Sequence, residues 1–283
     1  MNPQFQQPQQ QQQALLPGVK NTIAVASGKG GVGKSTVAIN LAVALANEGH
    51  SVGLIDADVY GPSAPMMLGI SGKPVVNNQK LVPLEAHGIK VMSIGFLVDE
   101  DQAMIWRGPM ASGAVRQFMS DVEWGELDYI VFDLPPGTGD IQLTLVQSIP
   151  LTGAVIVTTP QDIALTDARK GMKMFERVNV PVFGIVENMS YYVCPSCGHR
   201  DEIFSYGGGK VSAENLGTEF LGEIPLYTKI REGGDSGKPI VVLEPDSEHT
   251  KKFIEISRNL HEEVKKYNET RPEGGGGDIV IDV

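Results

Sequence analysis

Short apolar, β-branched runs recur along the middle of the chain, and most of them are continuous rather than alternating with polar residues. They predict strands at residues 22–27, 51–56, 90–94, 129–134, 154–158 and 182–186. Strands of this kind are typical of a parallel sheet that is covered by helices on both faces.

Helical patterns separate several of these strands. They cover residues 34–47, 109–122, 140–149, 164–178 and 248–267, with Ser247 placed to cap the last one. Strand–helix alternation predicts an α/β fold: a doubly wound, mostly parallel sheet with right-handed crossovers and helices on both faces. We expect one such domain over residues 19–267, a disordered Gln-rich tail over 1–18, and a flexible, Gly-rich acidic tail over 268–283.

A glycine-rich segment joins the first predicted strand to the first predicted helix. It matches the P-loop pattern of Gly, four residues, Gly-Lys-Ser, and its residues are Gly28, Lys29, Gly30, Gly31, Val32, Gly33, Lys34, Ser35 and Thr36. Backbone N–H groups in such a loop surround phosphate oxygens, Lys34 can reach the β- and γ-phosphates, and the Ser35 hydroxyl can ligate Mg²⁺. The sequence therefore predicts an ATP site. Another glycine-rich stretch, residues 206–210, has no such strand–helix context and is expected to be a loop.

Acidic residues end two of the predicted strands, at the edge of the sheet where ligands bind in open α/β folds. Asp133 is the expected Mg²⁺-site acid, holding the ion through water. Asp56 and Asp58 follow the other strand, and Asp58 is the better candidate to orient the attacking water. Residues 135–140 resemble a switch loop that responds to the γ-phosphate.

The P-loop carries an additional lysine, Lys29, and thereby resembles the deviant Walker A loop of the MinD, ParA, ArsA and nitrogenase-iron-protein group. Further segments resemble the Mrp/ApbC-type iron–sulfur cluster carrier ATPases within that group: residues 56–63, 106–109, 133–140, 187–190 and 194–198. The resemblance implies an ATP-dependent homodimer in which Lys29 reaches the partner's nucleotide. It also implies that Asn188 contacts the adenine and that Pro225, in 224–226, forms the other side of the base pocket.

The chain has two cysteines, Cys194 and Cys197, in one Cys-x-x-Cys motif. Two facing pairs in a homodimer supply four thiolates, enough for a bridging [4Fe–4S] cluster or for tetrahedral Zn²⁺. A free thiol pair or a small loop staple is the third interpretation, and spacing alone does not separate the three. His199 is expected to be a surface residue rather than a ligand. The family resemblance favours the cluster.

Charge and hydropathy narrow the choice of function. Lys and Arg total 23 against 34 Asp and Glu, a net charge of −11, which disfavours binding to nucleic acid or to anionic membranes. No apolar run approaches the roughly 20 residues of a membrane span, and no signal peptide is recognisable, so we expect a cytoplasmic protein.

The combined pattern predicts an ATP-hydrolysing homodimeric carrier that receives iron–sulfur clusters from assembly proteins and delivers them to apo-proteins. The rival functions are a ParA/MinD-like partitioning or positioning ATPase and a zinc-bridged nucleotide-binding dimer.

Overall fold

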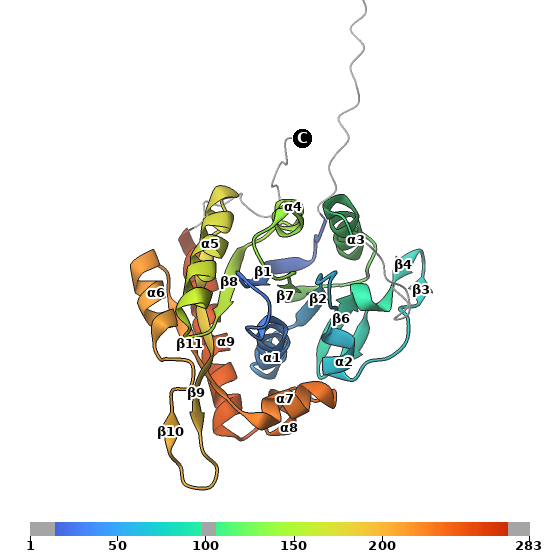
Figure 1. Ribbon diagram of the computed structural model, residues 1–283. Coiled ribbons are helices and arrows are strands. Elements are labelled where there is room, and N and C mark those ends of the chain that lie inside the picture. The colour runs from blue at the N-terminus through green and yellow to red at the C-terminus, as the bar shows by residue number, and fades with distance from the viewer. Residues whose placement is uncertain (1–14, 98–105, 271–283) are drawn as a thin grey trace, which may run out of the picture.

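The computed structural model describes residues 15–97 and 106–270, and in these residues nine strands form one sheet (Figure 1). The strand order is β10-β9-β8-β1-β7-β2-β6-β5, with β11 pairing with β9. The strands are β1 (Val19–Ala26), β2 (Val52–Asp56), β5 (Leu84–Ala86), β6 (Ile89–Ser93), β7 (Leu127–Asp133), β8 (Gly153–Thr158), β9 (Val182–Val193), β10 (Arg200–Asp201) and β11 (Phe220–Leu226). All pairings are parallel except those of β5 and β10. A separate hairpin joins β3 (Val76–Asn77) and β4 (Lys80–Leu81).

Helices cover both faces of the sheet. The helices are α1 (Lys34–Asn47), α2 (Ala64–Leu68), the 3₁₀ helix η1 (Ile94–Phe96), α3 (Gly108–Ser120), α4 (Asp140–Ser148), α5 (Asp162–Arg177), α6 (Gly208–Leu216), α7 (Thr228–Asp235), α8 (Ile240–Leu243) and α9 (Glu248–Thr270). Successive residues of β1 point to opposite faces: Ile23 packs with α1 and α9, whereas Ala24 packs with α3, α4 and α5. The doubly wound, mostly parallel α/β prediction is thus confirmed.

The predicted strands and helices are all present, and their ends shift by a few residues in most cases. The large difference is β9, which continues to Val193 instead of ending near residue 186, because β10 and β11 pair with its extension. Ser247 caps α9 as expected: its Oγ accepts a hydrogen bond from the backbone N–H of Thr250 at 3.1 Å.

The domain edges lie slightly outside the expected ones. Leu16 is buried in the core and α9 ends at Thr270. The remainder of the predicted tails, residues 1–14 and 271–283, lies outside the described residues. No helix in the described part of the chain is both long enough and apolar enough to span a membrane.

The expectation of a loop at residues 206–210 is wrong, because α6 begins at Gly208. Gly207 precedes it in a left-handed conformation, with φ 73°. The backbone N–H groups of Gly207 and Gly209 donate to the carboxylate of Glu187 on β9. Glu187, which is distant in sequence, therefore accepts hydrogen bonds from backbone N–H groups at the start of this helix. The local sequence offers no side-chain cap there.

Candidate nucleotide site and cysteine hairpin

The P-loop lies between the end of β1 and the start of α1. Two of its glycines are required because other segments of the chain lie against the loop at these positions. At Gly33, φ is 80°, and a Cβ atom there would lie 2.2 Å from Nδ2 of Asn188. At Gly28, a Cβ atom would lie 2.1 Å from the carbonyl oxygen of Asp167 in α5. Larger residues at either position would displace the loop.

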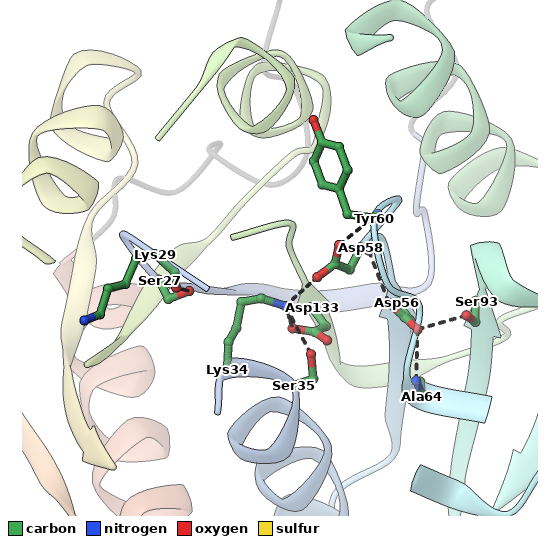
Figure 2. A network of polar contacts seen from close by, with 10 residues as sticks. All are labelled: Ser27, Lys29, Lys34, Ser35, Asp56, Asp58, Tyr60, Ala64, Ser93 and Asp133. Atoms are coloured by element: carbon green, nitrogen blue, oxygen red, sulfur yellow. Dashed lines mark hydrogen bonds and ion pairs between the residues drawn. The ribbon is translucent and has the colours of Figure 1, made fainter. Parts of the chain in front are cut away.

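A buried charged group lies beside the loop (Figure 2). The side chain of Lys34 is 5% exposed, and its Nζ lies 2.5 Å from Oδ1 of Asp133 and 3.5 Å from Oδ2 of Asp58. It also lies 3.2 Å from the Oγ of Ser35. The structure therefore brings together Lys34, Ser35, Asp58 and Asp133, the four side chains that the sequence places around the phosphates and Mg²⁺.

Burial and charge act against each other in this group. Burial disfavours the charged form of Lys34, but attraction to Asp133 and Asp58 outweighs it, so the lysine pKa is raised. Burial is also the main influence on Asp133 and raises the pKa of its carboxyl, while the neighbouring Lys34 opposes that effect. The lysine and the carboxylate are thus held together away from bulk water.

The oxygen atoms at this position fit a magnesium ion. Within the described residues, Oδ2 of Asp133 is buried and has no hydrogen-bond partner, although Oδ1 contacts Lys34. Mg²⁺ is bound in proteins by carboxylate, hydroxyl and water oxygens. Asp133, Ser35 and Asp58 supply that donor set on neighbouring elements.

Asp56 has a different environment, although its Cα pairs directly with that of Asp133 across β2 and β7. Its Oδ2 accepts hydrogen bonds from the Ala64 N–H and the Ser93 hydroxyl, and its Oδ1 accepts one from the Asp58 N–H. Burial, reinforced by the nearby Asp133, raises the pKa of Asp56 to about 7. Asp56 therefore fixes the 57–63 connection, and Asp58 is the residue that faces Lys34.

Two adjacent cavities extend from the P-loop. One of about 300 Å³ lies over the loop and is lined by Lys29, Lys34, Ser35, Asp58 and Pro136 among others. The other, of about 290 Å³, shares Gly33, Thr36 and Met67 with the first and is also lined by Asn188 and Pro225. This arrangement suits a nucleotide, with phosphates over the loop and a base beyond Gly33.

The base cavity contains residues that the sequence analysis missed. Met189 and Tyr227 line it, and the Tyr227 ring stacks on His249 with centroids 3.6 Å apart. Both follow directly from residues that the sequence did single out, since Met189 is next to Asn188 and Tyr227 is two residues after Pro225. Asn188 itself donates from Nδ2 to the carbonyl of Val32 at 2.9 Å, which ties β9 to the P-loop.

Lys29 lies on the rim of the phosphate cavity. Its side chain is half-buried and points away from Lys34 and Asp133 (Figure 2). The Ser27 hydroxyl donates to its carbonyl at 2.8 Å and holds the backbone at this point. The two lysines of the loop therefore face different surroundings.

The two cysteines lie at the end of a hairpin formed by β9 and β10, which projects from the rest of the fold (Figure 1). The N–H of Cys194 donates to the carbonyl of His199, and the N–H of Gly198 donates to the carbonyl of Cys194, both at 2.9 Å. Cys194 is half-buried and Cys197 is exposed. The N–H groups of Ser196 and Cys197 lower the pKa of the Cys194 thiol. In the part of the chain that is described, no three His, Cys, Asp or Glu side chains are grouped to hold a metal ion.

Comparison with known proteins assigns the fold to a family. Residues 18–261 match the family profile described as ParA: NUBPL iron-transfer P-loop NTPase. The chain belongs to this family. Membership confirms the resemblance found in the sequence, and it supports nucleotide hydrolysis in general terms.

Individual members of the family are closely similar to the chain. An "iron-sulfur cluster carrier protein" from Haemophilus influenzae is 54% identical over 254 residues, which are 89% of this chain and 69% of the relative. The "iron-sulfur cluster transfer protein NUBPL" of Dictyostelium discoideum is 50% identical over 256 residues, 89% of this chain and 79% of the relative.

Solved structures agree with the fold. A nucleotide-binding protein from Archaeoglobus fulgidus, in complex with ADP, superposes with a TM-score of 0.73 at 42% identity, covering 84% of this chain and 93% of the other. The cell-division ATPase MinD of Pyrococcus furiosus has a TM-score of 0.65 at 23% identity, covering 86% and 98%, and shares the fold.

Proposed function

We propose that the chain is an ATP-binding and ATP-hydrolysing homodimer that carries an iron–sulfur cluster and delivers it to apo-proteins. The observation that carries this proposal is the path of β9. The strand supplies Asn188 to the base cavity and continues to Val193, directly before Cys194. Nucleotide and cluster would therefore be held by one continuous element. The names of the similar proteins, a cluster carrier and a cluster transfer protein, support the same function.

The nucleotide would bind with its phosphates in the P-loop. Lys34 leaves Asp133 to neutralise the β- and γ-phosphates, and Ser35, Asp58 and Asp133 hold Mg²⁺, directly or through water. The ion neutralises charge on the transferring phosphoryl group. Asp58 orients the attacking water. Asn188 and Pro225 enclose the adenine, and the carbonyl end of the Asn188 amide is the acceptor that the adenine amino group requires.

The dimer would complete both sites. Lys29, directed away from its own Lys34, reaches the phosphates bound by the partner. Cys194 and Cys197 of each chain provide two of the four thiolates for a [4Fe–4S] cluster bridging the two-fold axis. Cluster-assembly proteins supply this cargo, and apo iron–sulfur proteins receive it.

Anaerobic reconstitution with iron and sulfide tests the proposal. We expect about four irons and four sulfides per dimer, with visible absorption that passes to an apo-protein acceptor on mixing. Cys194→Ala and Cys197→Ala should each abolish iron binding, whereas Ser196→Ala, between them, should retain it. Stoichiometric zinc without sulfide would instead establish the zinc-bridged dimer, and iron retained by both cysteine variants would refute the carrier function.

A further inference from the structure

The segment that carries the cysteines leaves the sheet and returns to it at one place. Ser190, on the outgoing strand, and Gly207, on the returning chain, both hydrogen-bond to the carboxylate of Glu187. The residues between them include both cysteines and form the β9–β10 hairpin. Glu187 therefore closes the base of the hairpin, a contact that the nucleotide chemistry does not use.

The Glu187 side chain is fully buried, and its partners are all uncharged donors. Oε1 accepts from the Ser190 hydroxyl at 2.5 Å and from the Gly207 N–H at 3.3 Å, and Oε2 accepts from the Gly209 N–H at 2.5 Å. Gly209 has no space for a side chain, because a Cβ there would lie 2.9 Å from Cβ of Glu187. The start of α6 and a hydroxyl thus hold one carboxylate in a fixed position.

Beyond this base, Arg200 connects the two sides of the hairpin. The guanidinium of Arg200 lies 3.7 Å from the ring centroid of Tyr191 and 4.6 Å from that of Tyr206. Arg200 also pairs with Val193 in the β9–β10 ladder. This stack joins the two sides of the hairpin between its base and the cysteine turn, and it offers a path along which a movement of the base would reach the turn.

At the base of the hairpin, β9 also contacts the nucleotide site. Asn188, the residue after Glu187, binds the P-loop carbonyl of Val32. Met189 lines the base cavity with φ 56°, a left-handed conformation that is strained for a long side chain. The pairing with β11 also bulges here, since Asn188 pairs with Ile224 but Tyr192 pairs with Leu226. A bulge bends a strand locally, so β9 changes direction where it lines the base cavity.

We propose that Glu187 is a positioning residue that couples the nucleotide site to the cysteine hairpin. A nucleotide in the base cavity displaces Asn188 and Met189. Glu187 transmits that displacement to the outgoing end of the hairpin through Ser190 and to the returning end through Gly207 and Gly209. A residue that only capped α6 would stabilise the helix equally with and without nucleotide. The proposal rests on the proposed carrier function, in which nucleotide would control the cysteine hairpin. Its test, however, requires no cluster.

The test measures thiol alkylation in the metal-free, reduced full-length chain, which contains only Cys194 and Cys197 as thiols. The rate with a maleimide is compared with and without Mg-ADP, at a protein concentration where size exclusion gives the same oligomeric state in both conditions. In the unmodified chain we expect nucleotide to change the rate about fivefold or more, the usual size of coupling between two sites. In Glu187→Gln the ratio of the two rates should fall to near one, while the Kd for ADP from calorimetry is unchanged.

Matched variants separate coupling from simple stabilisation. Glu223→Gln changes the carboxylate opposite Glu187 in β11, which contacts Ser190 and lies 4.0 Å from Arg200 but contacts neither glycine. The stack of Arg200 on Tyr191 and Tyr206 does not depend on that carboxylate, so this variant should keep the full ratio. Ser190→Ala removes one donor to Glu187 and should lower the ratio part-way, and it decides the question alone if Glu187→Gln does not fold. A wild-type ratio retained in Glu187→Gln, or in Ser190→Ala in that case, would overturn the proposal. A ratio of one in the unmodified chain would overturn it as well. Reconstitution that yields zinc or no metal refutes the carrier function but leaves the alkylation ratio interpretable.

Discussion

Single residues decide the chemistry of the P-loop, and Lys34 is the central one. Its ammonium group is buried with two carboxylates, at 2.5 Å from Asp133 and 3.5 Å from Asp58. Attraction to the two carboxylates outweighs burial and raises the pKa of Lys34, so a positively charged group is available to phosphate at this position.

Replacement of Lys34 tests this role. Lys34→Ala should lower the rate of ATP hydrolysis by about 10²-fold or more, because a positive group next to the transferring phosphoryl is lost. Asp58→Asn should spare ATP binding and slow hydrolysis, because the group that orients the attacking water is weakened. Phosphate release and calorimetric binding separate the two effects. Hydrolysis close to the wild-type rate in both variants would remove these residues from the mechanism.

Gly33 and Gly31 form a matched pair for the backbone of the loop. Both have φ near 80°, but only at Gly33 does a Cβ meet another group, the amide of Asn188. Gly31→Ala should cost only the strain of a left-handed alanine, about 1 kcal/mol. Gly33→Ala should lower the free energy of unfolding by more than Gly31→Ala does. It should also weaken ADP binding, because it separates the P-loop from β9. Thermal unfolding and calorimetry of the two variants give the comparison, and equal effects would show that the contact with Asn188 is unimportant.

Secondary-structure elements were predictable where local pattern alone determines them. α1 begins and ends at the predicted residues, since the P-loop fixes its start and a single apolar run fixes its length. The extension of β9 and the start of α6 were not predictable, because each depends on a partner far away in the sequence. β9 continues because β10 and β11 pair with it, and α6 starts because Glu187 accepts its first N–H groups. Tertiary contacts, rather than propensity, decide both elements.

Ser247 caps α9, and the contribution of this cap to stability can be measured. Ser247 Oγ accepts from the Thr250 N–H at the start of a helix that packs on α1 and β11. Ser247→Ala should lower the free energy of unfolding by about 1 kcal/mol, measured by urea denaturation. Ser196→Ala, at an exposed position in the cysteine turn, serves as the control and should leave the unfolding midpoint unchanged. A cap variant as stable as the control would mean that the packing of α9 alone fixes its start.

At the scale of the whole molecule, two features of the single chain bear on the proposed dimer. It has two thiols on a projecting hairpin, half of the four ligands that the proposed cluster would require, and a second P-loop lysine that points away from Lys34 and Asp133. The sequence indicated these positions but not their directions, because side-chain direction depends on how the loop packs. Both features are explained if a second copy faces the first across the edge of the sheet where the strands end.

The direction of Lys29 leads to a complementation test. Lys29→Ala should depress hydrolysis in the homodimer, and Lys34→Ala should do the same for a different reason. In a mixed dimer, the chain that carries Lys29→Ala keeps its own Lys34 and receives Lys29 from the partner, so one of the two sites is intact. With random pairing, about half of the dimers are mixed, and the mixture should recover about a quarter of the wild-type activity. Mixing Lys34→Ala with a chain that carries both substitutions leaves no intact site and should recover nothing. If differently tagged chains co-purify as mixed dimers and the first mixture stays inactive, then Lys29 acts within its own chain or not at all.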